Sequence, residues 1–321
     1  MNAIGVDVGG TKIAAAVVSP EGKPLNEVRY PTQAIPPNRL VETIARAITQ
    51  AKDGFEVGGV CVAVPGLILA AENKVIFSPN LHEIEGIPLD EEMGNRTGLA
   101  VTVENDANAA AWGEFRYGAG KDVEHMVFIT LGTGVGGGVT THGVLLRGAQ
   151  GAGGELGHVT IEPAGPRCGC GNHGCLEALA SGTAIERRAR EVANDRPDSA
   201  LARLAIHRQV LGEDVTELAQ SGDEAAMSVL EEAGRWLGIG LAGFVNIFNP
   251  EVIAVGGAAR AGEFILGPAR KEVQLRARSP SRDLVEIREA TLGPESGVLG
   301  AAALARGADG EYVLGPSKRV T

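Results

Sequence analysis

The sequence predicts an α/β protein with a duplicated fold in two domains, and three observations carry this prediction. Short apolar runs that end at glycine alternate with segments of helical spacing. A pattern of apolar strand, Gly/Thr tip and second strand occurs at residues 3–18 and again at residues 127–141. The length of 321 residues is sufficient for two domains, each with its own core.

Composition excludes several classes of protein. Hydrophobic residues make up 44% of the chain and charged residues 21%, which is ordinary for a globular protein. The net charge is −11 and no basic stripe is present, which argues against nucleic acid as a partner. No signal peptide or membrane-spanning apolar run is seen, and the cysteines do not form a secreted disulfide framework. We expect a reduced, cytoplasmic protein without a membrane partner.

The first glycine tip, residues 9–12, joins an apolar strand at Ala3–Val8 to a second strand at Ile13–Val18. Glycines let a backbone come close to a ligand and turn its N–H groups toward an anion. Asp7, at the end of the strand, could hold Mg²⁺ through water. The candidate phosphate and Mg²⁺ residues are Asp7, Gly9, Gly10, Thr11 and Lys12. An ordinary glycine hairpin explains this motif, taken alone, equally well.

The second glycine tip, residues 132–134, repeats the first. Val127–Leu131 reaches Gly132, Thr133 and Gly134, and a second strand leaves at Val135. Two such copies would face each other across a cleft and hold one phosphate chain between them. A third glycine pair, Gly256 and Gly257, follows a buried strand and would admit adenine or ribose to the backbone. A plain strand–helix turn is the alternative for that pair.

Periodicity predicts the remaining elements. Helical spacing marks Arg39–Lys52, Asp223–Phe248 with Met227 on its apolar stripe, and Glu263–Arg278. Leu99–Val103 and Leu284–Ile287 are predicted strands. An Ala/Leu helix at 296–306 is expected to pack on the first domain, so the predicted domains are 1–115 with that helix, and 116–295.

The strand at Leu99–Val103 delivers a polar segment, Glu104–Asn108, to the start of an Ala-rich helix. Open α/β sheets place their chemistry at the carboxyl ends of strands. A carboxylate there, Asp106, could take a proton from a substrate hydroxyl. The alternative is that Asn105 or Asp106 is only a helix N-cap. Asn80, in a loop after Phe77, could be a polar contact or a simple turn residue.

One segment, residues 151–177, holds three of the four cysteines. Its histidine and cysteines form a Cys₃His set typical of a closed structural zinc site, composed of His158, Cys168, Cys170 and Cys175. His173 is the competing ligand for the imidazole position. Glu155 and Glu177 flank the set, and Cys61 lies in a buried strand as a core residue.

The motifs together resemble the ROK family (repressors, open reading frames and kinases), and within it the bacterial glucokinases, over residues 3 to 306. The residues that carry the resemblance stand in this order: 6–12 (VDVGGTK), 104–108 (ENDAN), 131–138 (LGTGVGGG), 154–158 (GELGH), 168–177 (CGCGNHGCLE) and 255–257 (VGG).

This resemblance implies the actin-like, ribonuclease H-like fold, with ATP and a sugar in the interdomain cleft. It implies ATP-dependent phosphorylation of a hexose 6-hydroxyl, with Asp106 as general base and Mg²⁺ near Asp7. It favours His158 as the zinc ligand and suggests a homodimer or homotetramer. Sugar contacts are implied for Gly66, Asn80, Asn105, Asp106, Glu155, His158 and Glu177.

Three alternatives stay open within the resemblance. The substrate could be another hexose or an N-acetylhexosamine: N-acetylmannosamine, N-acetylglucosamine, fructose or allose. The donor could be polyphosphate, although no basic groove marks one. The protein could be a sugar-responsive transcriptional regulator. Because the first strand starts at residue 3 and the chain is acidic, we expect a kinase without a DNA-binding segment before that strand.

Overall fold

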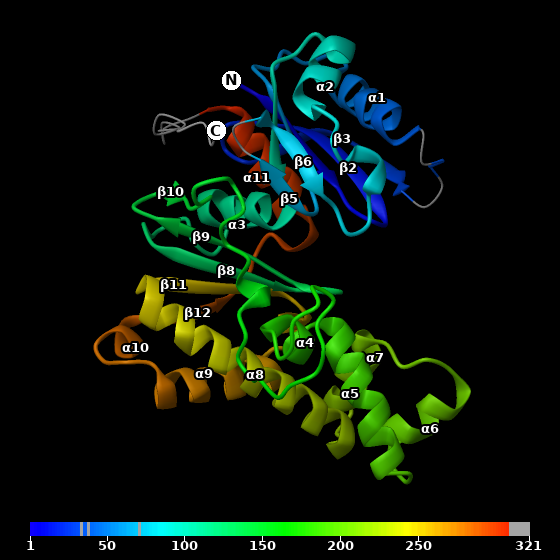
Figure 1. Cartoon of the computed structure of the whole chain (residues 1–321), viewed down its shortest axis with the longest axis vertical. Helices are drawn as coiled ribbons and strands as arrows, with labels where there is room; N and C mark the ends of the chain where they lie inside the picture. The colour runs from blue at the N-terminus through cyan, green and yellow to red at the C-terminus, as the bar shows by residue number, and fades with distance from the viewer. Residues whose placement is uncertain (33–34, 37–38, 70–71, 308–321) are drawn as a thin grey trace. The chain divides into compact units, whose positions relative to one another are not determined.

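The computed structural model describes residues 1–32, 35–36, 39–69 and 72–307. The chain divides into two compact units (Figure 1). Of the described residues, unit 1 comprises those within 1–124, 138–154 and 292–307, and unit 2 comprises His125–Gly137 and Glu155–Thr291.

The sheet of unit 1 has the order β3-β2-β1-β4-β7. β1 pairs antiparallel with β2 and parallel with β4, and β4 pairs parallel with β7. Buried strands within a parallel arrangement are apolar along their whole length, as β4 is. The strands are β1 (Ala3–Val8), β2 (Lys12–Val18), β3 (Pro24–Pro31), β4 (Val60–Val64) and β7 (Val101–Asn105), with a separate hairpin of β5 (Leu67–Leu69) and β6 (Lys74–Phe77).

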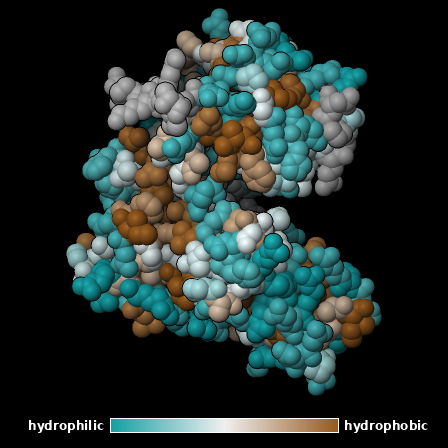
Figure 2. Space-filling view, viewed as in Figure 1, coloured by the Kyte–Doolittle hydropathy of each residue, from teal (hydrophilic) through white to brown (hydrophobic). Residues whose placement is uncertain are grey.

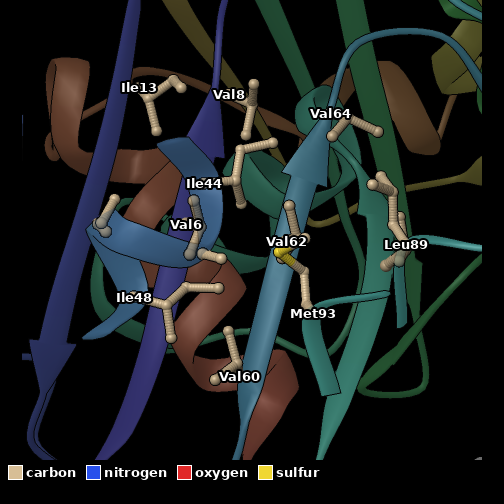
Figure 3. Packing of buried hydrophobic residues seen from close by; sticks show 14 of the residues in the cluster. Val6, Val8, Ile13, Ile44, Ile48, Val60, Val62, Val64, Leu89 and Met93 are labelled. Atoms are coloured by element: carbon tan, nitrogen blue, oxygen red, sulfur yellow. The ribbon is translucent and has the colours of Figure 1, made fainter. Parts of the chain in front are cut away.

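Side chains alternate between the two faces of this sheet. Ile13, Ala15 and Val17 of β2 point to one face and join the main core, which α1 (Leu40–Lys52) covers with Ile44 and Ile48 (Figure 3). α2 (Leu89–Thr97) closes the same core with its buried leucine and methionine. The apolar face of α1 is therefore what the helical spacing predicted.

The opposite face carries α3 (Asp106–Tyr117) and α11 (Ser296–Ala305). Ala16 and Val18 of β2 pack there against Val298 of α11. Glycines make the approach close: a Cβ at Gly5 would lie 1.9 Å from the carbonyl oxygen of Val298. The C-terminal helix thus packs on β1 and α3 within unit 1.

The second sheet has the order β10-β9-β8-β11-β12, which repeats the strand order of the first. β11 pairs parallel with both β8 and β12. The division between the units falls within β9. The strands are β8 (Met126–Leu131), β9 (Val135–Thr141), β10 (Val144–Leu145), β11 (Val252–Gly257) and β12 (Glu286–Glu289). This repetition confirms the predicted duplicated α/β fold.

The longest helix, α8, has the side chain of Asp223 as its N-cap and ends at Asn249 in the left-handed conformation. Gly234 and Gly238 bring it close to α9, where a Cβ at either would lie within 2.5 Å of a backbone oxygen. The visible surface over α5, α6 and α7 is mainly hydrophilic (Figure 2). The helices of unit 2 are α4 (Leu176–Ala180), α5 (Gly182–Asp195), α6 (Ala200–His207), α7 (Gly212–Gln220), α8 (Glu224–Phe248), α9 (Glu263–Arg276) and α10 (Ser281–Leu284).

Some local predictions were wrong. Leu284 ends α10 and is 74% exposed, so the strand predicted at Leu284–Ile287 begins two residues later, at Glu286. Met227 is 38% exposed and lies outside the buried stripe of α8. The β5–β6 hairpin and α2 were not predicted, because neither has a strong apolar period. Among the described residues, no helix combines the length and the apolar character needed to cross a membrane.

Candidate functional site

The carboxyl end of β7 leads directly into α3. Asn105 is the N-cap of α3, and its Oδ1 accepts from the backbone N–H of Asn108 at 3.0 Å. Its Nδ2 donates to the carbonyl oxygen of Gly66 at 3.1 Å. Asp106 is the first residue of the helix, and its Oδ1 accepts from the N–H of Ala107 at 2.9 Å. The N-cap interpretation is therefore right for Asn105, and it leaves the second oxygen of Asp106 for other contacts.

Asp7 and Asp106 of unit 1 are both partly buried carboxyls, and the charge of Asp106 acts on Asp7. Burial, followed by the charge of Asp106, raises the pKa of Asp7 to about 6, while Lys12 acts in the opposite direction. Burial raises the pKa of Asp106, against the backbone N–H donors at the start of α3. Two partly buried carboxyls with raised pKa values beside a lysine are typical of a catalytic or cation-binding site.

The first glycine tip is held by its own backbone and by Thr32, the residue after β3. The N–H of Gly9 donates to the carbonyl oxygen of Lys12 at 2.8 Å. The Thr32 hydroxyl donates to the carbonyl oxygen of Gly9 at 2.7 Å. Gly10 and Thr11 are exposed, so the tip presents free backbone to solvent. A Cβ at Gly10 would lie 3.8 Å from Asn80, which places that exposed asparagine beside the tip.

Gly66 is required by its backbone geometry. It has φ +116°, and a Cβ there would lie 2.0 Å from the carbonyl oxygen of Phe77. Its carbonyl oxygen accepts from Asn105, as described above. Unit 1 thus brings together all of its predicted site residues: Asp7, Gly9, Gly10, Thr11, Lys12, Gly66, Asn80, Asn105 and Asp106.

A buried charge network beneath Asp106 was missed by the sequence reasoning. Glu104 is 5% exposed, and its Oε1 accepts from the N–H of Asn105 at 3.0 Å and from Nδ2 of Asn108 at 3.1 Å. Its Oε2 accepts from Nε of Arg147 at 2.6 Å. The predicted strand ended at Val103, whereas β7 continues to Asn105 and so carries Glu104 into the sheet, where its carboxylate needs partners.

The second glycine tip lies beside the start of α5. The N–H of Gly182 donates to the carbonyl oxygen of Gly132 at 2.8 Å, and the Thr183 hydroxyl donates to that of Thr133 at 2.8 Å. Ser181 caps the helix. The N-terminus of α5 therefore adds partial positive charge next to the tip. This contribution of α5 was not predicted.

The third glycine pair ends β11 beside β8. Gly257 has φ +71°, and a Cβ there would lie 2.2 Å from the carbonyl oxygen of Leu131, directly before the second glycine tip. Gly256 is in register with Thr130. Unit 2 therefore places the predicted adenosine residues next to the predicted phosphate residues.

The Cys₃His set is assembled in unit 2. One ligand atom from each of His158, Cys168, Cys170 and Cys175 lies within 4.8 Å of the others. The Sγ of Cys168 is 3.6 Å from Nδ1 of His158, and the two remaining sulfurs are 3.7 Å apart. His173 is outside this set, with its Nδ1 3.2 Å from the carbonyl oxygen of Gly165.

The thiols of this set differ in environment. Burial raises the pKa of Cys168 and of Cys175, whereas the backbone N–H of Asn172 lowers that of Cys170. Burial raises the pKa of Cys61 to about 12, as expected of a core thiol in β4.

Glu177 joins the cysteine segment to the second glycine tip. Its Oε1 accepts from the Cys168 thiol at 3.3 Å, and its Oε2 accepts from the N–H of Val135 at 3.1 Å. A Cβ at Gly134 would lie 2.3 Å from that Oε2. On the other side, Nε2 of His158 lies 3.9 Å from Oε2 of Glu155. The imidazole thus turns Nδ1 to the cysteines and Nε2 to a carboxylate.

Comparison with known proteins identifies the family of the chain. The model of the ROK family matches residues 3–308. The chain is 40% identical to a glucokinase of Thermotoga maritima over 304 residues, 94% of this chain and 96% of that protein. It is 40% identical to a glucokinase of Streptomyces coelicolor over 312 residues, 95% of this chain and 98% of that protein.

A similar solved structure is that of a ROK family glucokinase from Streptomyces griseus in complex with glucose and AMPPNP. It has a TM-score of 0.83 and 39% sequence identity, and the match covers 95% of this chain and 99% of that chain. The family model and these relatives span nearly the whole chain, and the resemblance seen in the motifs is confirmed: this chain belongs to the ROK family.

Proposed function

We propose that this protein is a glucokinase, which transfers the γ-phosphoryl group of ATP to the 6-hydroxyl of glucose. The observation that carries the proposal is the carboxyl end of β7, where Asp106 follows the N-cap Asn105 and its charge helps to raise the pKa of Asp7. The glucokinase relatives, and the glucose and AMPPNP bound in the Streptomyces griseus protein, support the choice of substrate and donor.

Asp106 acts as the general base in this proposal. Its raised pKa makes it a stronger base than an ordinary aspartate, and the N–H of Ala107 holds one oxygen in place. The other oxygen receives the proton of the 6-hydroxyl as that hydroxyl attacks phosphorus. Phosphoryl transfer asks mainly for positioning and charge neutralisation, so a rigidly held carboxylate is sufficient chemistry.

In this proposal the glycine tips bind the phosphates of the nucleotide. Gly9, Gly10, Thr11 and Lys12 hold phosphate oxygens in unit 1, and Gly132, Thr133 and Gly134 hold them in unit 2. The N-terminus of α5 adds its dipole to the second tip. Gly256 and Gly257 accept adenosine. Asp7 fits Mg²⁺, because a carboxylate beside phosphates is the usual protein contribution to such a site; the cation would neutralise charge on the phosphates.

Sugar recognition depends on polar groups with fixed hydrogen-bonding atoms. Asn80, Asn105 and Asp106, with Gly66, serve from unit 1, and Glu155, His158 and Glu177 serve from unit 2. A polyol needs many fixed donors and acceptors, and a wrong epimer leaves some of them without a partner. Backbone groups alone would not distinguish one sugar epimer from another in this way.

The Cys₃His set fits a structural zinc ion. Ligand atoms at a Zn–S distance of 2.3 Å in a tetrahedron lie about 3.7 Å apart, and the contacts of 3.6 and 3.7 Å agree with that spacing. His158, Cys168, Cys170 and Cys175 would hold the metal, which would order the segment that carries Glu155 and Glu177. Free thiols as ligands suit a reducing cytoplasm. We further expect a homodimer or homotetramer that serves glycolysis.

A coupled kinase assay over a panel of hexoses and N-acetylhexosamines, with ATP and polyphosphate as donors, tests the proposal. We expect glucose with ATP to give the highest kcat/KM. A higher value for another sugar or for polyphosphate would reassign the substrate. If no combination of sugar and phosphoryl donor gives turnover, the proposed kinase function is wrong.

A further inference from the structure

Burial of the Glu104 carboxylate costs folding free energy. It occupies the fourth pairing position of β7, opposite Ala63 of β4, and its side chain is 6% exposed. A carboxylate buried in a parallel sheet is expensive unless it is paired and hydrogen-bonded. An apolar residue would fill the same space more cheaply, so the charge calls for an explanation beyond packing.

Each oxygen of Glu104 has a separate task. Oε1 accepts from the backbone N–H of Asn105 and from the side chain of Asn108, one residue before and two residues after Asp106. The carboxylate therefore grips the turn between β7 and α3 on both sides of Asp106. Because Asn105 also bonds Gly66 and caps α3, the turn has little freedom left.

Arg147 supplies the counter-charge from another segment of unit 1. Its Nε meets Oε2 of Glu104 at 2.6 Å, and its side chain is 17% exposed. Its backbone is held as well, since the N–H of Gly153 donates to its carbonyl oxygen at 2.8 Å. The arginine thus orients the carboxylate from an anchored position.

We propose that Glu104 and Arg147 are positioning residues, a buried ion pair that holds the β7–α3 turn so that the Asp106 carboxylate meets the sugar hydroxyl. The inference rests on the proposed function, in which Asp106 is the base. The pair contacts neither substrate in this assignment. Its effect is geometric, and a displacement of about 1 Å at a reacting group can lower the rate by on the order of a hundredfold.

Two single variants and their combination test the pair. Glu104→Gln keeps the shape but turns an amide toward Arg147, and Arg147→Met keeps the volume but removes the charge. We expect each to lower kcat by on the order of tenfold to a hundredfold, with the KM of sugar and of ATP changed less than about threefold. The double variant removes both charges together and should recover most of the thermal stability lost by Arg147→Met, because no charge is left buried alone, while its kcat stays as low as that of the single variants.

Arg276→Met is the matched control. It removes an arginine from the buried Glu272 in unit 2, whose carboxylate also meets Arg235. Its thermal stability should fall while its kcat stays at the wild-type value. If Glu104→Gln and Arg147→Met behave like this control, with lower stability and unchanged kcat, the positioning role is wrong.

Crystal structures of the wild type and of Arg147→Met give a readout that does not depend on turnover. We expect the Asp106 carboxylate to move relative to β4 and α11 while the sheet of unit 1 keeps its register. An unmoved Asp106 would overturn the inference. Wild-type protein without hexose kinase activity would overturn the proposed function instead, so the two failures are distinguishable.

Discussion

The two glycine tips have the same strand frame and different surroundings. Asp7 and Thr130 hold equivalent places, each the fifth residue of a six-residue strand that ends at a tip. Each strand is the middle one of its five-stranded sheet and has a parallel partner on one side, β4 for β1 and β11 for β8. The first tip has ionisable neighbours, Lys12 and Asp106. The second has none in its strand and is braced by α5 and by Glu177.

The two halves of this duplicated fold therefore carry different kinds of chemical group at equivalent positions. Unit 1 carries groups that change charge, and burial moves their pKa values toward the physiological range. Unit 2 carries neutral backbone groups at its tip, which hydrogen bonds with the start of α5 and with Glu177 support. We therefore expect substitutions near the first tip to affect turnover, and substitutions near the second to affect binding and local stability.

Asp106→Asn should have the largest effect. The amide keeps the shape and the N–H contact but cannot accept a proton, so kcat should fall by ~10²–10⁴-fold with little change in the KM of glucose. Steady-state kinetics measures it, with the exposed Glu91→Gln on α2 as the matched charge control. A rate near that of the wild type would remove Asp106 from the role of base.

Loss of the metal should come next. A structural zinc contributes on the order of 10 kcal/mol to its local fold, so Cys170→Ser should lower the thermal midpoint and raise the KM of glucose together. Zinc content per chain and differential scanning calorimetry measure this.

His173→Ala is the matched variant within the same segment. It should keep one zinc per chain, and His158→Ala should not. The opposite pattern would assign the metal to His173, and full activity in zinc-free protein would remove the organising role of the site.

Gly134→Ala sharpens the comparison of the two tips. Its Cβ would lie 2.3 Å from Glu177, whereas a Cβ at Gly10 would lie 3.8 Å from Asn80. Overpacking costs ~1–3 kcal/mol, so Gly134→Ala should raise the KM of ATP by about tenfold or more and also weaken glucose binding. Gly10→Ala should change both values by less than about threefold. Equal effects would mean that Glu177 does not brace the second tip.

The smallest effect concerns pH and stability. Since the folded chain holds the proton of Asp7 up to pH about 6, against an ordinary value of 3.8, it binds more protons than the unfolded chain in that window. Stability therefore falls as pH rises from about 4 to about 6 and does not recover above it. Asp7→Asn should remove part of this loss.

Urea unfolding at pH 4, 5 and 7, without added Mg²⁺, measures that prediction. The unfolding free energy of Asp7→Asn should rise relative to that of the wild type as pH rises, even though the variant loses kinase activity. A difference in unfolding free energy that is independent of pH would contradict the raised pKa of Asp7.

Much of the site was readable from short motifs. Gly66 stands where the backbone has a positive φ and where a Cβ would lie only 2.0 Å from a carbonyl oxygen, so that position requires glycine. The spacing of Cys168, Cys170 and Cys175 restricts the ligand set before any folding is known. The N-cap at Asn105 is likewise local, because a strand followed by Asx and an Ala-rich run leaves few other conformations.

Other features escaped because they depend on distant segments. Arg147 reaches Glu104 across 43 positions of sequence, and no local pattern pairs them. The strand expected at Leu284 failed for a similar reason, since β12 is defined by its pairing with β11. Short apolar runs leave strand ends free to shift until a neighbour supplies hydrogen bonds.

The amino-acid sequence by itself determined the family, the duplicated α/β fold, the glycine tips and the clustering of three cysteines in one segment, because these depend on residue type and on near neighbours. Only the tertiary structure decided that His158 joins the cysteines, that Glu177 reaches Val135 and that Glu104 is buried against Arg147. Those contacts arise when separate segments exclude water together, and the charge or hydrogen bond that each residue then needs is set by burial.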